Sequence, residues 1–232
     1  MFIPFNDQNP LKHIAFQHVT VALMVLNTAI YLFMQSEIFP TSSQHGYLAF
    51  AIIPSELTTG EIVFPTAISL PEKFTLVTYL FFHGGWLHLL SNMLFLWVFG
   101  DNIEDAMGHG RFLVFYLLCG AAAGLTHAYV SPNSNAPLIG ASGAIAGVTG
   151  AYIMLYPKVK VWVFVLMKIP LRLSAVWILA AWFALQVFYV VTDVTANVAW
   201  WAHIGGFVAG AALVVVFKRP AVTLFGAAPI SR

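Results

Sequence analysis

Six long apolar runs dominate this sequence and leave little room for other structure. A helix needs about twenty apolar residues to cross the roughly 30 Å hydrocarbon core of a bilayer. Five of the runs hold nineteen residues or more, and only 8% of the 232 residues are charged. Soluble domains do not have such a composition. The chain is therefore predicted to be an all-α membrane protein with six transmembrane helices, over residues 14–34, 74–100, 112–130, 142–156, 173–191 and 198–217.

The runs divide the chain into a membrane domain, residues 14–217, and two short ends, residues 1–13 and 218–232. The first residues lack the basic region and the compact apolar stretch of a cleavable signal peptide. The net charge of +1 gives no argument for nucleic acid, and no such partner is expected. The single cysteine, Cys119, lies within an apolar run and excludes both a disulfide framework and a cysteine metal site.

The basic residues are distributed very unevenly between the two sides of the membrane. Six spans place both ends on one side, and that side holds nine of the ten Lys and Arg residues, leaving only Lys73 on the other. The positive-inside rule then predicts that both termini lie in the cytoplasm. The nine residues are Lys12, Arg111, Lys158, Lys160, Lys168, Arg172, Lys218, Arg219 and Arg232.

The connection between the first two runs, residues 35–73, is long and rich in proline. Two apolar segments within it, residues 47–53 and 62–68, are too short to span a bilayer. We expect both to lie in the membrane interface, as we do for the brief apolar segment 161–167 between two lysines.

The fourth run is too short to cross the membrane alone. From Ser142 to the residue before Pro157 it holds fifteen residues, about 22 Å of helix against roughly 30 Å of hydrocarbon. If its far end lies at the cytoplasmic surface, Ser142 begins several Å below the outer one. Small residues surround this serine, and in membrane proteins such residues usually only pack helices. A chemical role for Ser142 therefore requires partners.

A histidine in the sixth run is the first such partner. Polar residues within spans are energetically expensive, which makes them functional candidates. Gly210 and Gly206 lie within about 20° and 60° of His203 around a helix. Small residues at spacings of four in both runs allow the two helices to approach closely, so the imidazole can reach the Ser142 hydroxyl. Taken alone, His203 would more often be a structural histidine bonded to a carbonyl.

The second run supplies two hydrogen-bond donors. His88 and Asn92 are four residues apart and share one face of a helix. An acyl-transfer site of low dielectric needs such neutral donors where the oxyanion develops. His83 lies on the opposite face, beside two glycines, and is interpreted as a structural residue at the helix start. A metal site made of the histidines is disfavoured because no carboxylate within the spans joins them.

These residues together predict a site for acyl transfer. Ser142 would be the nucleophile, and His203 the general base and then acid. His88, Asn92 and the backbone N–H of Ser142 would stabilise the oxyanion. No Asp or Glu lies inside a span to orient His203, and Asp193 precedes it by ten residues in a loop. The residues therefore favour a Ser–His dyad over a triad.

The motifs resemble those of the rhomboid family of intramembrane serine proteases. The six-run layout, the long first connection and an acidic stretch ending at Glu104 also agree with that family, over about residues 14–217. The matching motifs are His83-x4-His88-x3-Asn92, Gly140-Ala141-Ser142-Gly143 and Ala202-His203-x2-Gly206-x3-Gly210.

The resemblance implies a six-helix rhomboid bundle that cleaves peptide bonds in or near the transmembrane helices of membrane protein substrates. It implies no metal, nucleotide or other cofactor. It also implies a bacterial inner membrane, with lipid around the bundle and an active site open to the outer side. The implied catalytic residues are Ser142 and His203, the oxyanion-stabilising ones His88, Asn92, Gly140 and Gly143, and the structural ones near the site His83, Glu104, Gly206 and Gly210.

Two departures from familiar bacterial members bear on the site. Many of them carry an aromatic residue four positions after the serine, where this chain has Ala146, and several have a Trp-Arg pair in the first loop that is missing here.

The loop 192–197 is expected to cap the site. Trp182, Phe183 and Phe188 are either gate residues for a substrate helix or aromatics that face lipid.

Two other functions remain in competition. A catalytically silent rhomboid-like protein would bind membrane clients, although such relatives usually lack the serine or the histidine, and this chain has both. A small transporter is disfavoured because the sequence has neither an internal repeat nor a ladder of carboxylates within its spans. No residue pattern points to a particular oligomeric state.

Overall fold

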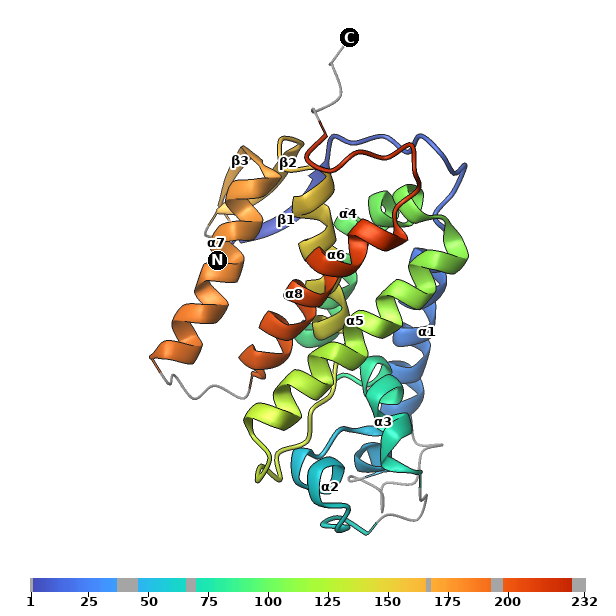
Figure 1. The fold of residues 1–232 in the computed structure, drawn as a ribbon, viewed down its shortest axis with the longest axis vertical. Coiled ribbons are helices and arrows are strands. Elements are labelled where there is room, and N and C mark those ends of the chain that lie inside the picture. The colour runs from blue at the N-terminus through green and yellow to red at the C-terminus, as the bar shows by residue number, and fades with distance from the viewer. Residues whose placement is uncertain (1, 37–45, 66–69, 166–167, 193–197, 227–232) are drawn as a thin grey trace.

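Six long helices carry the architecture of the computed structural model, which describes residues 2–36, 46–65, 70–165, 168–192 and 198–226. Each falls on one of the predicted runs, and they extend broadly along the long axis of the molecule (Figure 1). By length and composition α1, α5 and α8 can each cross a membrane, while α6 and α7 are shorter apolar helices. The six are α1 (His18–Gln35), α4 (Trp86–Met107), α5 (His109–Val130), α6 (Ser142–Leu155), α7 (Ala175–Val191) and α8 (Trp200–Phe217).

The predicted second span is wrong at both ends. Its first part forms α3 (Glu72–Thr78) and the 3-10 turn η3 (Tyr79–Phe81), and α4 begins only at Trp86. The two glycines before Trp86 explain this break, because glycine is a poor helix former. At the other end α4 continues to Met107, into the stretch predicted to connect the second and third spans, and only Gly108, with a φ of 88°, separates it from α5. A positive φ favours glycine at this corner.

The first connection packs against the helices. It contains the 3-10 turn η2 (Gly46–Phe50) and α2 (Pro54–Thr59). Ile52 and Ile53 are fully buried, and Ile52 forms an isolated β-bridge with Leu138. These two side chains therefore pack inside the protein, and the interfacial location of residues 47–53 stays a prediction. Ile62 is 70% exposed, and residues 66–68 of the second segment lie outside the described part of the chain.

A three-stranded antiparallel sheet departs from the all-α prediction. Its order is β1 (Phe2–Asp7), β2 (Lys160–Val165) and β3 (Ile169–Ser174). Val161 and Val163 are fully buried while Phe164 is exposed, which is the alternation of a strand with one covered face. The sequence analysis did not predict these strands because short apolar runs do not reveal their partners, and the interfacial location of this segment stays a prediction. The partner here is the start of the chain.

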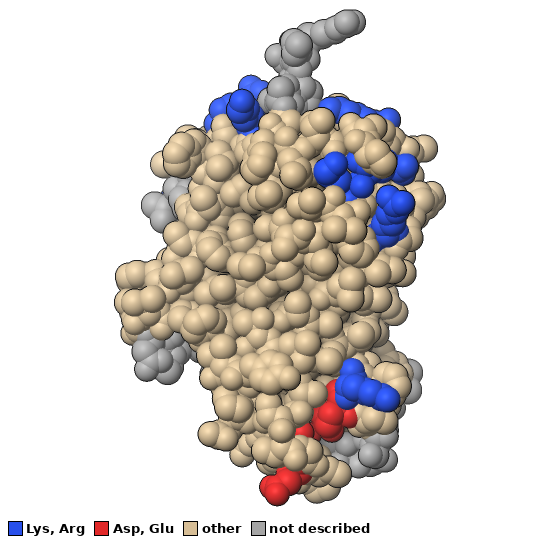
Figure 2. All heavy atoms as spheres, viewed as in Figure 1, with Lys and Arg blue, Asp and Glu red and all other residues tan. Residues whose placement is uncertain are grey.

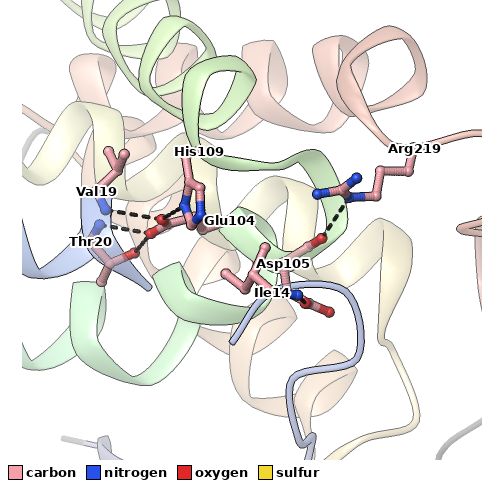
Figure 3. A network of polar contacts seen from close by, with 7 residues as sticks. All are labelled: Ile14, Val19, Thr20, Glu104, Asp105, His109 and Arg219. Atoms are coloured by element: carbon pink, nitrogen blue, oxygen red, sulfur yellow. Dashed lines mark hydrogen bonds and ion pairs between the residues drawn. The ribbon is translucent and has the colours of Figure 1, made fainter. Parts of the chain in front are cut away.

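Two neighbouring carboxylates at the end of α4 bind the beginning of α1 and the segment before it (Figure 3). The fully buried Glu104 accepts hydrogen bonds from the backbone N–H groups of Val19 and Thr20, at 2.9 and 2.7 Å. It also contacts the Thr20 hydroxyl at 2.7 Å and His109 Nδ1 at 2.5 Å. Glu104 therefore supplies the N-terminal cap that α1 lacks from its own residues.

Asp105 completes this attachment with its side chain and its backbone. The carboxylate accepts N–H bonds from Lys12, His13 and Ile14, at 3.0, 2.6 and 2.8 Å. The carbonyl accepts a bond from Arg219 Nε at 3.2 Å, so the segment before α1 and the segment after α8 meet at the end of α4. Figure 2 shows most of the Lys and Arg atoms on this face gathered at the end of the molecule where the sheet and residues 218–226 lie, and acidic residues beside further basic atoms at the opposite end.

The backbones of α6 and α8 touch where glycines face each other. A Cβ atom added to Gly206 would lie 2.0 Å from the carbonyl oxygen of Gly143, and one added to Gly210 would lie 1.9 Å from that of Gly147. A Cβ atom added to Gly150 would likewise lie 2.2 Å from the carbonyl oxygen of Phe207. The close approach predicted from the small-residue spacing is confirmed.

Replacing Gly206 with alanine should therefore destabilise the protein strongly. The new methyl group meets a backbone carbonyl that cannot move aside without separating the helices, so we expect a loss of about 3 kcal/mol, the upper end for overpacking. Gly110→Ala is the matched control, because a Cβ atom there has no other atom within 4 Å. Thermal unfolding in detergent would measure both, and equal unfolding temperatures would contradict this packing.

A partly buried carboxyl joins the first strand to α6. Asp7 accepts hydrogen bonds from the Tyr152 hydroxyl at 2.5 Å and from Asn102 Nδ2 at 3.1 Å. Burial raises the pKa of Asp7 from 3.8 to about 7, and the charge of nearby Asp101 adds to the increase. The hydrogen bond from Tyr152 acts in the opposite direction but does not offset the burial.

Replacing Asp7 with asparagine should flatten the dependence of stability on pH. The pKa is higher in the folded state than in the unfolded state, so this contribution to stability is lost as the pH rises from about 4 to about 7. Asparagine does not titrate but still accepts the bond from Tyr152. The unfolding temperature should fall more across this window for the wild type than for Asp7→Asn, and parallel curves would show that Asp7 ionises normally.

Candidate active site

Ser142 and His203 lie within hydrogen-bond distance of each other. Ser142 is the first residue of α6, and His203 lies in the first turn of α8. The Nε2 atom of His203 is 2.9 Å from the Ser142 Oγ atom. The glycine contacts between α6 and α8 make this distance attainable, because neither side chain extends more than a few Å from its backbone. A hydroxyl and an imidazole in this arrangement can act as nucleophile and base.

The other ring nitrogen of His203 has a partner that the sequence reasoning missed. Nδ1 of His203 lies 2.9 Å from Oε1 of Gln186, a residue of α7 that is 3% exposed. The signal was present, because Gln186 is the one amide in an otherwise apolar run. Asp193, which the sequence analysis considered as a partner, lies outside the described residues.

Two tryptophans pack around the histidine where an aromatic residue on α6 is missing. Ala146 is buried in α6 and brings no ring to His203. Trp182 of α7 and Trp200 of α8 have ring centroids 5.8 and 6.1 Å from the His203 ring. The imidazole is thus contacted by aromatics from its own helix and from the neighbouring one.

His88 and Asn92 lie beside the turn that leads into the serine. A Cβ atom on Gly140 would be 2.6 Å from His88 Nε2 and 3.8 Å from Asn92 Nδ2. Gly140 has a φ of 121°, which a residue with a side chain rarely adopts. Asn92 Nδ2 is buried and has no hydrogen-bond partner among the described residues. An unpaired buried donor of this kind can bind an anionic oxygen.

The start of α6 adds backbone donors to the same place. The first N–H groups of a helix have no partner within it. Ala141, the residue that precedes α6, provides no side-chain cap for them. A Cβ atom on Gly143 would lie 2.6 Å from the Ala123 Cβ atom, which shows how closely α5 approaches here. The backbone N–H groups of Ser142 and Gly143 lie at this helix start, just after the Gly140 turn that Asn92 approaches.

The remaining predicted residues divide into those near the site and one that is far from it. His83 lies in the loop before α4, and its ring centroid is 5.0 Å from that of His88. Glu104 does not lie near the site, because it is twelve residues from Asn92, roughly 18 Å along α4. The prediction of a structural role near the site is wrong for Glu104, which instead caps α1. No group of three potential metal ligands occurs among the described residues.

The candidate gate aromatics are in different surroundings. Trp182 lies between α4 and α8, with its ring centroid 6.4 Å from that of Phe95. Phe183 stacks on Phe207 at 4.4 Å, and Phe188 is 55% exposed. Of the three, only Phe188 fits the description of an aromatic that faces lipid.

Comparison with known proteins supports the class that this geometry defines, a helical membrane protein with a paired serine and histidine. A family model for the Rhomboid domain matches residues 71–220, which is 150 of the 232 residues. The chain belongs to the rhomboid family and is an integral membrane protein.

Relatives come from bacteria and from plant organelles. Rhomboid protease GluP of Bacillus subtilis (strain 168) is 32% identical over 155 residues, which cover 67% of this chain and 28% of GluP. RHOMBOID-like protein 6, mitochondrial, of Arabidopsis thaliana is 32% identical over 139 residues, 60% of this chain and 42% of that protein. Rhomboid-like protein 11, chloroplastic, from the same plant is 40% identical over 77 residues, 33% of this chain and 27% of its own length. The chain spans less than half the length of these curated relatives.

Proposed function

We propose that the protein is an intramembrane serine endopeptidase. The observation that carries the proposal is the 2.9 Å contact between Ser142 Oγ and His203 Nε2, beside the unpaired donor of Asn92. Membership of a family that includes rhomboid protease GluP supports the same activity. The substrates are membrane proteins, cut in or near a transmembrane helix.

The reaction follows from the positions of these groups. His203 Nε2 accepts the proton of the Ser142 hydroxyl while Oγ attacks the carbonyl carbon of the scissile bond. The resulting oxyanion is stabilised by Asn92, His88 and the free N–H groups at the start of α6. The same histidine then protonates the leaving amine, and water hydrolyses the acyl-enzyme with His203 again as the base.

The membrane position of the site is part of the proposal. Six spans, formed by the six long helices, place both ends of the chain on the side rich in Lys and Arg, which we assign to the cytoplasm. Residues 14–217 form the membrane domain, and residues 1–13 and 218–232 lie on the cytoplasmic side. The start of α6 then lies in the outer half of the bilayer. We place the protein in a bacterial inner membrane, although relatives named for mitochondria and chloroplasts show that the family also occurs in organelles.

A silent client-binding protein is the alternative, and one observation weighs against it. A protein that only binds membrane clients has no need for an imidazole aligned on a serine hydroxyl. Both residues are present and bonded to each other in this chain.

Serine-directed labelling tests the proposal most directly. The purified protein should react covalently with a fluorophosphonate at Ser142, and Ser142→Ala should abolish the reaction, as should loss of the base in His203→Ala. Cleavage of a single-span test substrate should disappear with the labelling. Ser91→Ala, which alters an exposed serine of α4, is the control and should label like the wild type. Equal labelling of wild type and Ser142→Ala would refute the assignment of the nucleophile.

Asn92→Ala should reduce cleavage without preventing folding. If the Asn92 amide donates to the oxyanion, its loss should lower kcat roughly 10²–10³-fold, as for other oxyanion-hole donors. KM should change little because the bond strengthens only in the transition state. A variant that cleaves at the wild-type rate would remove Asn92 from the site.

A further inference from the structure

His203 and its two hydrogen-bond partners lie on three different helices. Ser142 is on α6, His203 on α8 and Gln186 on α7, and both bonds to the imidazole measure 2.9 Å. We propose that Gln186 is a positioning residue that holds His203 in the tautomer and orientation needed to activate Ser142. This role rests on the proposed protease function, which it makes more specific.

The orientation of the Gln186 amide follows from a second hydrogen bond. Its Nε2 atom lies 3.1 Å from the backbone carbonyl oxygen of Trp182, one turn earlier in α7. A carbonyl oxygen only accepts hydrogen bonds, so the NH₂ group must face it. The amide oxygen is then directed at His203 Nδ1, as the structure shows.

This orientation determines which nitrogen of the imidazole carries the proton. An amide oxygen accepts only, so Nδ1 must be the N–H donor. A neutral imidazole has one donor and one acceptor, which leaves the lone pair on Nε2 facing the Ser142 hydroxyl. A general base requires this tautomer, and the opposite tautomer would present an N–H to the serine.

An amide suits this position better than a carboxylate. Gln186 is 3% exposed and lies within an apolar helix, where a charged group would be costly to bury. A neutral acceptor aligns the ring without that cost, although it stabilises the protonated imidazole less than a carboxylate would. No ion pair links His203 to a carboxylate within the described part of the chain. The other titratable side chains with an electrostatic influence on His203 are the imidazoles of His88 and His127.

The tautomer can be observed without any enzymatic reaction. Protein labelled with ¹⁵N-histidine should show His203 protonated at Nδ1 near neutral pH, with its signals assigned by comparison with His203→Ala. In Gln186→Leu the signals should shift toward a mixture of tautomers. Protonation at Nε2 in the wild type would overturn the role of Gln186.

The dependence of Ser142 labelling on pH tests the functional consequence. Gln186→Leu should lower the maximal rate of fluorophosphonate labelling roughly 10- to 100-fold, less than loss of a triad carboxylate. Gln186→Glu should retain more activity than Gln186→Leu, and its half-maximal rate should shift to higher pH because a carboxylate stabilises the protonated ring. The corresponding shift for Gln186→Leu should be to lower pH.

The controls separate positioning from general damage to the fold. Gln35→Leu removes a glutamine that bonds Tyr31 far along the chain, and Leu185→Ala alters an exposed neighbour on α7. Both should retain the wild-type rate and pH profile. If both Gln186 variants lose rate without opposite shifts in pH, or if Gln186→Leu matches the wild type, Gln186 does not position the base. A wild-type protein that does not label at Ser142 would overturn the proposed function and this role with it.

Discussion

The site depends on the contact between the backbones of α6 and α8. A serine hydroxyl and an imidazole on neighbouring helices can meet only if the helices approach much more closely than large side chains allow. In a bilayer, apolar surfaces gain little by leaving lipid, so such an approach relies on close packing and hydrogen bonds. Gly206 and Gly210 of α8 place their Cα atoms directly against carbonyl oxygens of α6, and this contact sets the distance from Ser142 to His203.

Hydrogen bonds at the ends of the helices complement this contact. Glu104 and Asp105 are buried, and their oxygens accept hydrogen bonds from backbone N–H groups in the first turn of α1 and in the segment before it. They attach the start of the chain to α4, as Asp7 attaches the first strand to α6 through Tyr152. The serine-bearing helix is thus held at one end by the sheet and along its face by α8.

The sequence was least informative where structure depends on a distant partner. The strand at residues 160–165 pairs with the first residues of the chain, a contact that no local pattern reveals. Glu104 was associated with the site because of a motif, but its position along α4 directs it to the start of α1. Gln186 was not predicted because an amide is not the acid of a catalytic triad, although any polar group in an apolar helix needs a partner.

Length and composition alone determined that this chain lies in a membrane and which runs carry its long helices, because the bilayer imposes the same thickness on every span. The chemistry was indicated by His88 and Asn92, which share a helix face at a spacing of four, and by the small residues spaced around Ser142 and His203. The tertiary structure decided which groups meet. It places His203 2.9 Å from both Ser142 and the Gln186 amide, and it pairs the first residues of the chain with a distant strand in the sheet. These contacts join residues far apart in sequence, and only the packing of the helices brings them together.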